Sequence, residues 1–267
     1  MISRRQFGAL AGGAIGALAL GGACHSKSEP VPANDGRLTV RPGAGVATSI
    51  QGEIALGLDA ARDAILRLPT KATAAPLPLL VLLHGATESA EGVLGRLAPA
   101  VDETGIAVLA PNSRDSSWDA IRYTFGPDVI FLNRALERVF EKVPIDPRRI
   151  SIGGFSDGAT YALSLGLING DLFSRVVAFS PGFVIDGTPA GRPRFFISHG
   201  TDDPILPIDR CGRRVASSLK ARGYEVTFRE FAGGHTVPAD IAREGMRWVA
   251  VLASESSQRR SAQGDQG

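Results

Sequence analysis

The chain has 267 residues, of which 44% are hydrophobic and 21% charged, and its formal net charge is +2. These values fit one soluble domain of generous size and exclude a disordered or collagen-like chain. Arg4 and Arg5 account for the positive excess, and the other arginine pairs are scattered, whereas nucleic-acid-binding proteins concentrate Lys and Arg on one face. We therefore expect no nucleic-acid partner.

The chain offers few side chains for metal or cofactor chemistry. It has 2 cysteines among 267 residues and 4 histidines, and it contains no HExxH and no CxxC motif. It also lacks a GxGxxG motif behind a strand and a GxxxxGKS/T motif, which mark dinucleotide and phosphate-loop sites. We predict that the protein uses no metal and no cofactor, and that its own side chains carry out its chemistry.

Residues 1–23 form a leader of the kind that directs export. An arginine pair before Phe7, followed by an apolar run, resembles a twin-arginine signal, and the run is shorter than the about 20 residues that span a bilayer. Cys24 follows a stretch like a lipoprotein cleavage site, so lipidation there would tether the protein to a membrane; ordinary signal cleavage is the alternative. We expect export to the bacterial periplasm or cell envelope. Residues 24–47 lack periodicity and are expected to form a flexible tether.

Short apolar runs separated by helical patterns predict an α/β domain over residues 48–253, followed by a disordered tail over 254–267. Unbroken apolar runs are typical of strands buried on both faces of a parallel sheet. Apolar runs of this kind, some of them interrupted by polar residues, occur at residues 79–83, 106–110, 150–152, 176–179, 195–197 and 226–231. Apolar residues at helical spacing predict helices near 127–143 and 238–252. The alternation predicts a mostly parallel central sheet with helices on both faces, and it leaves no room for a large lid domain.

Ligands of such sheets bind beyond the carboxyl ends of the strands, so the residues that follow each strand matter most. Gly154-Phe155-Ser156-Asp157-Gly158 follows a predicted strand and precedes a helical stretch that reaches about Ile168. The five-residue GxSxG pattern alone is weak in a chain with 32 glycines, but a strand, a tight turn and a helix are what a nucleophile elbow requires. The helix start would place partial positive charge beside Ser156. Ser156 is therefore the predicted nucleophile.

A serine nucleophile needs a base to take its proton, and histidine is the candidate. His25 lies in the predicted tether, and His84 and His199 end predicted strands, where we expect them to hydrogen-bond to loop backbone. His235 follows the last predicted strand, in the order Ser, Asp/Glu, His of elbow hydrolases, and is the predicted base. A predicted loop after the strand at residues 195–197, which lies between Ser156 and His235 in the sequence, offers two adjacent carboxylates as the orienting acid. They are Asp202 and Asp203.

Three blocks of the sequence resemble the α/β-hydrolase superfamily, and within it the phospholipase/carboxylesterase group that includes acyl-protein thioesterases. They are the GxSxG elbow, Leu83-His84-Gly85-Ala86, and an HGxxDPxxP block over residues 199–207 with a later Gly234-His235. The resemblance implies that Asp203 is the acid and that the backbone N–H groups of Ala86 and Asp157 form an oxyanion hole. The chain departs from the family at Asp157, where acyl-protein thioesterases usually have Gln, and at Ala159, where many relatives have Gly. The helix dipole favours a carboxylate at position 157, and a carboxylate facing the substrate would disfavour anionic acyl chains.

Taken together, the residues and the resemblance predict an exported serine hydrolase that cleaves small-molecule carboxylic esters. The acyl pocket has three aromatic candidates for its wall, with a place in the local core as the alternative: Trp118, Tyr123 and Phe183. A peptidase, or a polyester or feruloyl esterase of the same fold, is the alternative enzyme. A non-catalytic exported binding protein with this fold is the alternative outside catalysis.

Overall fold

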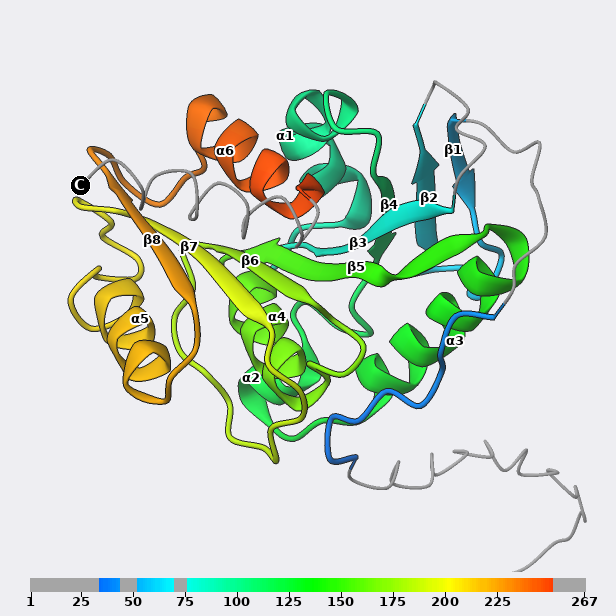
Figure 1. Cartoon of the computed structure of the whole chain (residues 1–267), viewed down its shortest axis with the longest axis horizontal. Coiled ribbons are helices and arrows are strands. Elements are labelled where there is room, and N and C mark those ends of the chain that lie inside the picture. Colours follow the sequence, from blue (N-terminus) through cyan, green and yellow to red (C-terminus); the bar gives the residue numbers. More distant parts are fainter. Residues whose placement is uncertain (1–33, 44–51, 70–75, 252–267) are drawn as a thin grey trace, which may run out of the picture. The chain divides into compact units, whose positions relative to one another are not determined.

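The computed structural model describes residues 34–43, 52–69 and 76–251 (Figure 1). The predicted signal, Cys24, most of the predicted tether and the predicted tail lie outside these residues. Within the described part of the chain, no helix is both long enough and apolar enough to cross a membrane.

The described residues form one sheet of eight strands in the order β1-β2-β4-β3-β5-β6-β7-β8. The strands are β1 Gly52–Ala55, β2 Ala64–Leu68, β3 Leu77–Leu83, β4 Ala107–Pro111, β5 Ile145–Phe155, β6 Arg175–Phe179, β7 Arg194–Gly200 and β8 Val226–Phe231. β3 to β8 are parallel to one another, which confirms the predicted sheet. β1 and β2 pair antiparallel at one edge, and sequence analysis missed them because neither carries an unbroken apolar run.

Helices cover both faces of the sheet, as predicted. They are α1 Ala90–Asp102, α2 Asp119–Arg122, α3 Pro127–Lys142, α4 Asp157–Ile168, α5 Gly212–Ala221 and α6 Ala239–Ala250. α2 to α5 lie on one face and α1 and α6 on the other (Figure 1). The side chains of β3 divide between two apolar cores: Leu79, Val81 and Leu83 point to the first, and Leu80 and Leu82 to the second. This division explains the unbroken apolar run, because a strand covered on both faces has no polar side.

Helix α3 shows how the sequence specifies one element. Pro127 occupies its first turn, where a missing N–H costs nothing and the fixed φ angle of proline suits a helix. Its buried face carries Val129, Leu132 and Val139, at the spacing of one helical face. The helix ends before Pro144, since the residue that precedes a proline disfavours helical backbone.

Residues 34–43, here called the N-terminal segment, pack on α3 and α4 instead of forming a flexible tether. Asn169, just after α4, accepts the N–H of Leu38 at 2.8 Å and donates to the carbonyl of Gly36 at 2.8 Å. Asn133 on α3 accepts two further backbone N–H groups of the segment. The tether prediction is therefore wrong for these residues, and the folded body begins before residue 48. Local composition did not reveal hydrogen-bond partners that lie about a hundred residues away along the chain.

Candidate active site

Ser156 lies in the tight turn between β5 and α4, with φ 56° and ψ −120°, a region that residues other than glycine rarely adopt. A Cβ atom at Gly154 would lie 2.6 Å from the carbonyl oxygen of Leu83, and one at Gly158 would lie 2.3 Å from the same oxygen. Side chains at these two positions would push the turn away from β3. The glycines therefore let the turn sit against β3 and hold Ser156 in its strained backbone conformation.

The side chains of Ser156, His235 and Asp203 form a continuous chain of hydrogen bonds. Ser156 Oγ lies 2.9 Å from His235 Nε2, and His235 Nδ1 lies 2.7 Å from Asp203 Oδ2. A carboxylate only accepts, so the proton of His235 is on Nδ1 and its Nε2 is free to accept the hydroxyl proton of Ser156. The three groups come from loops after β5, β7 and β8, at the carboxyl edge of the sheet.

The structure brings Asp203, and not Asp202, to His235. Asp203 is buried, and its Oδ1 accepts the backbone N–H groups of Ile205 and Leu206, each at 2.9 Å. Burial raises the pKa of Asp203, but the hydrogen bonds from the two N–H groups and from His235 outweigh burial and hold that pKa below the ordinary value. Asp202 is exposed and accepts the hydroxyl of the neighbouring Thr201.

Ala86 and Asp157 lie next to Ser156: Ala86 borders the same cavity, and Asp157 is the following residue. Asp157 is the first residue of α4, where an N–H has no acceptor within the helix. Ala86 follows β3, and its N–H meets no acceptor in the described part of the chain. A cavity of about 390 Å³ opens over Ser156, and it is lined by Gly85, Ala86, Thr87, Glu88, Arg96, Phe155, Ser156, Ile205 and His235.

His84 orients the loop that carries Ala86. Its Nε2 accepts the N–H of Ser113 at 3.0 Å, so its proton is on Nδ1, which donates to the carbonyl of Gly85 at 2.7 Å. Burial lowers the pKa of His84, which keeps the ring neutral. The Gly85 oxygen belongs to the same planar peptide group as the N–H of Ala86, so His84 sets the direction of that N–H. The expected bond from His84 to loop backbone is confirmed.

The carboxylate of Asp157 faces the loop between β4 and α2. Its Oδ2 accepts the hydroxyl of the buried Ser117 at 2.6 Å. The bond joins the elbow to this loop, and the position at the start of α4 favours the negative charge. We interpret Asp157 as a stabilising residue of the elbow.

None of the three aromatic candidates lines the cavity over Ser156. Trp118 is only 1% exposed, and its Nε1 donates to the carbonyl of His84 at 2.9 Å, which fits the alternative of a place in the local core. Its indole packs between the rings of His84 and Tyr161. Tyr123 and Phe183 are 78% and 47% exposed and also lie outside that cavity. Sequence spacing did not separate core aromatic residues from pocket aromatic residues, because both follow strand ends.

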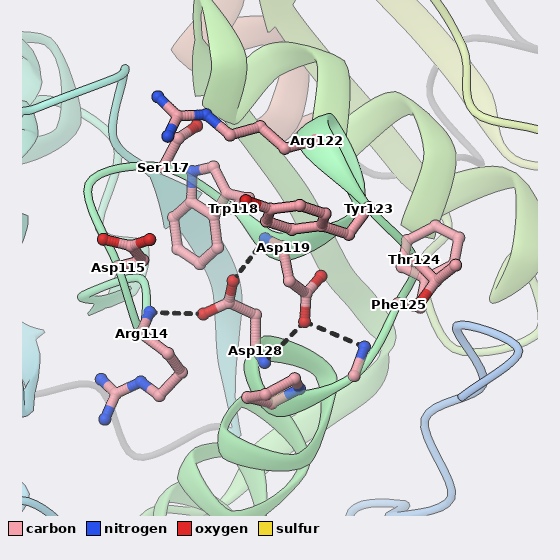
Figure 2. A pocket seen from close by; sticks show the side chains of 12 residues that line it. Arg114, Asp115, Ser117, Trp118, Asp119, Arg122, Tyr123, Thr124, Phe125 and Asp128 are labelled. Carbon is pink, nitrogen blue, oxygen red and sulfur yellow. Dashed lines mark hydrogen bonds between the residues drawn. The ribbon is translucent and has the colours of Figure 1, made fainter. Parts of the chain in front are cut away.

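Trp118 and Tyr123 instead border a second cavity of about 340 Å³, built by residues 114–128 (Figure 2). Its floor is a pair of carboxylates. Asp128 accepts the N–H groups of Arg114 and Asp119, and Asp119 accepts those of Gly126 and Asp128 (Figure 2). Burial and the neighbouring charge of Asp119 raise the pKa of Asp128 to about 6. The carboxylate oxygens are occupied by backbone N–H groups and, at Asp119, also by the hydroxyl of Tyr161 at 2.8 Å, so the pair holds the loop in shape.

Comparison with known proteins finds a family model that matches part of the chain. The family model described as Phospholipase/Carboxylesterase matches residues 132–247, which include Ser156, Asp203 and His235. This match and the similarity to acyl-protein thioesterases support an esterase group of the α/β-hydrolase superfamily. This confirms the resemblance that the three sequence blocks indicate.

The chain is similar to several curated and solved proteins. It is 32% identical over 108 residues to an acyl-protein thioesterase 1 of Gibberella zeae, covering 36% of this chain and 46% of that one. It is 33% identical over 103 residues to a probable feruloyl esterase C of Aspergillus niger, covering 38% and 37%. The chain thus spans less than half the length of these relatives. Its fold matches a carboxylesterase of Bacillus cereus with a TM-score of 0.57 and 23% identity, covering 72% of this chain and 94% of that one.

Sequence analysis missed the residues that support the loop after β3. Glu88 accepts the N–H of Gly85 at 3.0 Å and forms an ion pair with Arg96, whose guanidinium lies over the ring of Phe155. Thr87 has φ 59°, which is rare for a β-branched residue, and its N–H is held by the carbonyl of Ser116 at 2.6 Å. No short motif marks these residues, because their roles depend on contacts between separate elements.

Proposed function

We propose that the α/β-hydrolase is a serine hydrolase that cleaves carboxylic esters through an acyl-enzyme on Ser156. The observation that carries this proposal is the chain of hydrogen bonds from Ser156 Oγ through His235 to Asp203, at 2.9 and 2.7 Å. A hydroxyl is a poor nucleophile until a base removes its proton, and this geometry supplies the base and a carboxylate that orients it. The similarity to esterases and thioesterases supports the same chemistry.

In the first half of the proposed reaction, Ser156 Oγ attacks the carbonyl carbon of the ester while its proton passes to His235 Nε2. The resulting imidazolium carries its charge next to Asp203, which stays ionised because two backbone N–H groups and His235 hold it. The tetrahedral intermediate then collapses and breaks the bond to the alcohol oxygen. That oxygen takes the proton from His235 and leaves, and the acyl group remains on Ser156.

The second half repeats these steps with water. His235 takes a proton from water as its oxygen attacks the acyl carbon, and the second intermediate releases the carboxylic acid and returns the proton to Ser156 Oγ. The cavity over Ser156 is bordered by His235 and by the exposed side chain of Ile205, so solvent reaches the base directly. The proposed steps use protein groups and water.

Charge on the carbonyl oxygen would be stabilised by the N–H groups of Ala86 and Asp157. Donors that are already oriented need no rearrangement when the charge develops, and each is worth about 2.7 to 4 kcal/mol in comparable enzymes. Two contacts support this orientation here: the bond from His84 to Gly85, and the bond from Gly85 to Glu88.

Substitution of Ser156 by Ala tests the proposal. We expect Ser156→Ala to lower kcat for p-nitrophenyl butyrate by roughly ten-thousand-fold or more, because the acyl-enzyme cannot form. Labelling by a fluorophosphonate should be lost in the same variant. The control is Ser217→Ala, which removes the hydroxyl of an exposed serine on α5 and should keep full activity. Unchanged turnover in a folded Ser156→Ala protein would refute the proposed mechanism.

A second candidate is hydrolysis of esters of aromatic acids. The similarity to a probable feruloyl esterase C and the second cavity, with its aromatic side chains, favour it. The Ser117–Asp157 bond connects the wall of that cavity to the residue after Ser156. Turnover of methyl ferulate, compared with an aliphatic ester and an acyl thioester in one assay, distinguishes the two candidates. Export and lipidation of Cys24 concern residues outside the described ranges and stay predictions.

A further inference from the structure

A second buried histidine lies beside the acid of the proposed triad. His199, on β7, is 0% exposed, and its Nε2 lies 2.7 Å from the carbonyl oxygen of Leu206 and 3.3 Å from Asp203 Oδ2. Its Nδ1 has no hydrogen-bond partner within the described residues. A Cβ atom at Gly212 would lie only 2.6 Å from Nδ1, so the first residue of α5 closes that side of the ring. The two nitrogens of His199 therefore have opposite surroundings.

These surroundings determine where the proton of His199 is. Nε2 faces two acceptor oxygens, whereas a proton on Nδ1 would be buried without an acceptor, so the neutral ring carries its proton on Nε2. Burial also lowers the pKa of His199, which keeps the ring uncharged. His199 is thus a donor toward the acid loop and not a second base, since its unprotonated nitrogen, Nδ1, is buried against Gly212.

The loop from Asp203 to Leu206 depends on this donor for its shape. Asp203 Oδ1 accepts the N–H of Leu206 at 2.9 Å, and the carbonyl of the same residue accepts from His199. Leu206 is therefore tied at its N–H by the acid and at its carbonyl by His199. Without the second tie, Leu206 would be fixed only through its N–H, the loop that holds the carboxylate could shift, and Asp203 Oδ2 would lose its alignment with His235.

We propose that His199 is a positioning residue of the reaction. It donates from Nε2 to the Leu206 carbonyl, next to Asp203 Oδ2, and so holds Asp203 in the orientation that receives the N–H of His235. The proposal rests on the proposed function, because it concerns the steps in which His235 exchanges a proton with Ser156. His199 does not line the cavity over Ser156, so its loss should affect kcat and leave KM nearly unchanged.

A pair of nearly isosteric substitutions tests this role. Gln at position 199 keeps an N–H donor at about the distance of Nε2, whereas Met has the same length and no donor. We expect His199→Met to lower kcat for p-nitrophenyl butyrate about tenfold, the effect of one lost hydrogen bond, with KM changed less than about twofold. His199→Gln should recover most of that loss. The rate of fluorophosphonate labelling should follow kcat, because it reports the reactivity of Ser156 itself.

The controls separate positioning from packing. Ser198→Ala alters the preceding buried residue of β7, whose hydroxyl has no hydrogen-bond partner among the described residues, and should keep full activity. If His199→Met does not fold, His199→Asn serves as the variant without the donor. The Asn amide is one methylene too short to reach the carbonyl of Leu206. Equal kcat in the Gln variant and the variant without the donor would overturn the proposal. If the unmodified protein itself hydrolyses no ester, the proposed function fails instead.

Discussion

Two adjacent carboxylates, Asp202 and Asp203, have opposite environments although the sequence offered both as the acid. Asp203 turns inward, where two backbone N–H groups and His235 compensate its charge. Asp202 stays in solvent, and within the described residues its carboxylate accepts the hydroxyl of its neighbour Thr201. A carboxylate that accepts several N–H groups keeps its charge even when buried, which a base-orienting residue requires.

Matched substitutions of the two carboxylates should separate their roles. Asp203→Asn replaces an acceptor by an amide that cannot hold the same His235 tautomer, and we expect kcat to fall about ten-thousand-fold. Asp202→Asn should leave kcat within about twofold, because an exposed surface substitution touches no reacting group. Steady-state kinetics on one ester, with circular dichroism to verify folding, measures both. Comparable losses in the two variants would contradict the assignment of Asp203.

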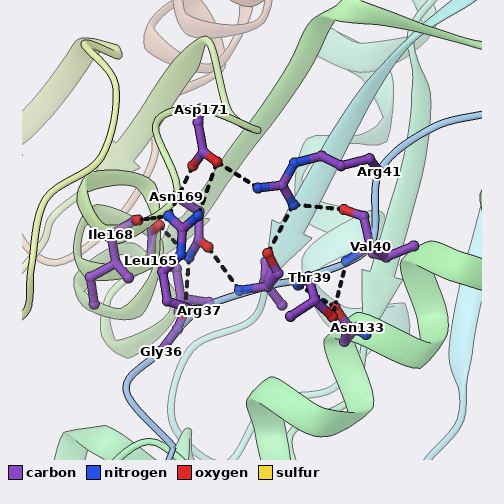
Figure 3. Close-up of polar contacts among 11 residues, drawn as sticks. Gly36, Arg37, Thr39, Val40, Arg41, Asn133, Leu165, Ile168, Asn169 and Asp171 are labelled. Atoms are coloured by element: carbon purple, nitrogen blue, oxygen red, sulfur yellow. Dashed lines mark hydrogen bonds and ion pairs between the residues drawn. The ribbon is translucent and has the colours of Figure 1, made fainter.

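At the scale of elements, the N-terminal segment is held by side chains from the helix layer (Figure 3). Asn169 and Asn133 satisfy its backbone, and Asp171 pairs with Arg37 and Arg41 at 2.9 and 2.6 Å. The hydrogen bond from Arg37, together with Arg41, lowers the pKa of Asp171 to about 2. The buried amide and the half-exposed ion pairs should nevertheless contribute very differently to stability, because solvent screens exposed charges.

Asn169→Ala should destabilise the protein more than Asp171→Asn. The first substitution leaves the N–H of Leu38 and the carbonyl of Gly36 without a partner, and we expect it to lower the free energy of unfolding by about 1 to 3 kcal/mol. The second disrupts ion pairs at the surface and should cost less than about 1 kcal/mol. Urea unfolding curves measure both values. A larger loss in Asp171→Asn would show that the ion pairs, and not the amide, hold the segment.

The elements also show what sequence patterns can and cannot predict. The apolar run over β3 and the spacing in α3 predicted both elements, because burial on two faces or on one face leaves a local signature. The N-terminal segment was misjudged, because its partners Asn133 and Asn169 lie far away in the sequence. Contacts between distant residues leave no periodic pattern along the chain.

At the scale of the whole sheet, parallel strands bring the proposed triad together. Ser156 and His235 are 79 residues apart in sequence, and Asp203 and His235 are 32 apart, yet all three follow the carboxyl ends of strands in one sheet. Once parallel strands were predicted, residues that follow them were expected at one edge. The strand order was not predictable, because every central strand carries the same kind of apolar run. The sequence could therefore predict that the three residues share one edge of the sheet. It could not predict the strand register that aligns their hydrogen bonds.

The stability of the whole molecule should depend on pH through one buried carboxylate outside the proposed triad. Burial and the charge of Asp119 raise the pKa of Asp128 from the ordinary value of 3.8 to about 6. Between these two pH values the folded protein binds a proton that the unfolded chain does not bind. Because protonation favours the folded state here, the free energy of unfolding should fall as pH rises through this window, by up to about 3 kcal/mol.

Comparison with Asp128→Asn isolates this contribution, since the amide does not titrate. Its lost hydrogen bond lowers stability by an amount that is the same at each pH, whereas the contribution of Asp128 itself changes with pH. We therefore expect the unmodified protein to lose stability relative to Asp128→Asn as pH rises from about 4 to about 7. Urea unfolding at several pH values measures this difference. If the stability curves of the unmodified protein and of Asp128→Asn run parallel across this window, Asp128 is ionised in the folded protein throughout. The hydrogen bonds that it accepts from Arg114 and Asp119 would then fully offset the effect of burial on its pKa.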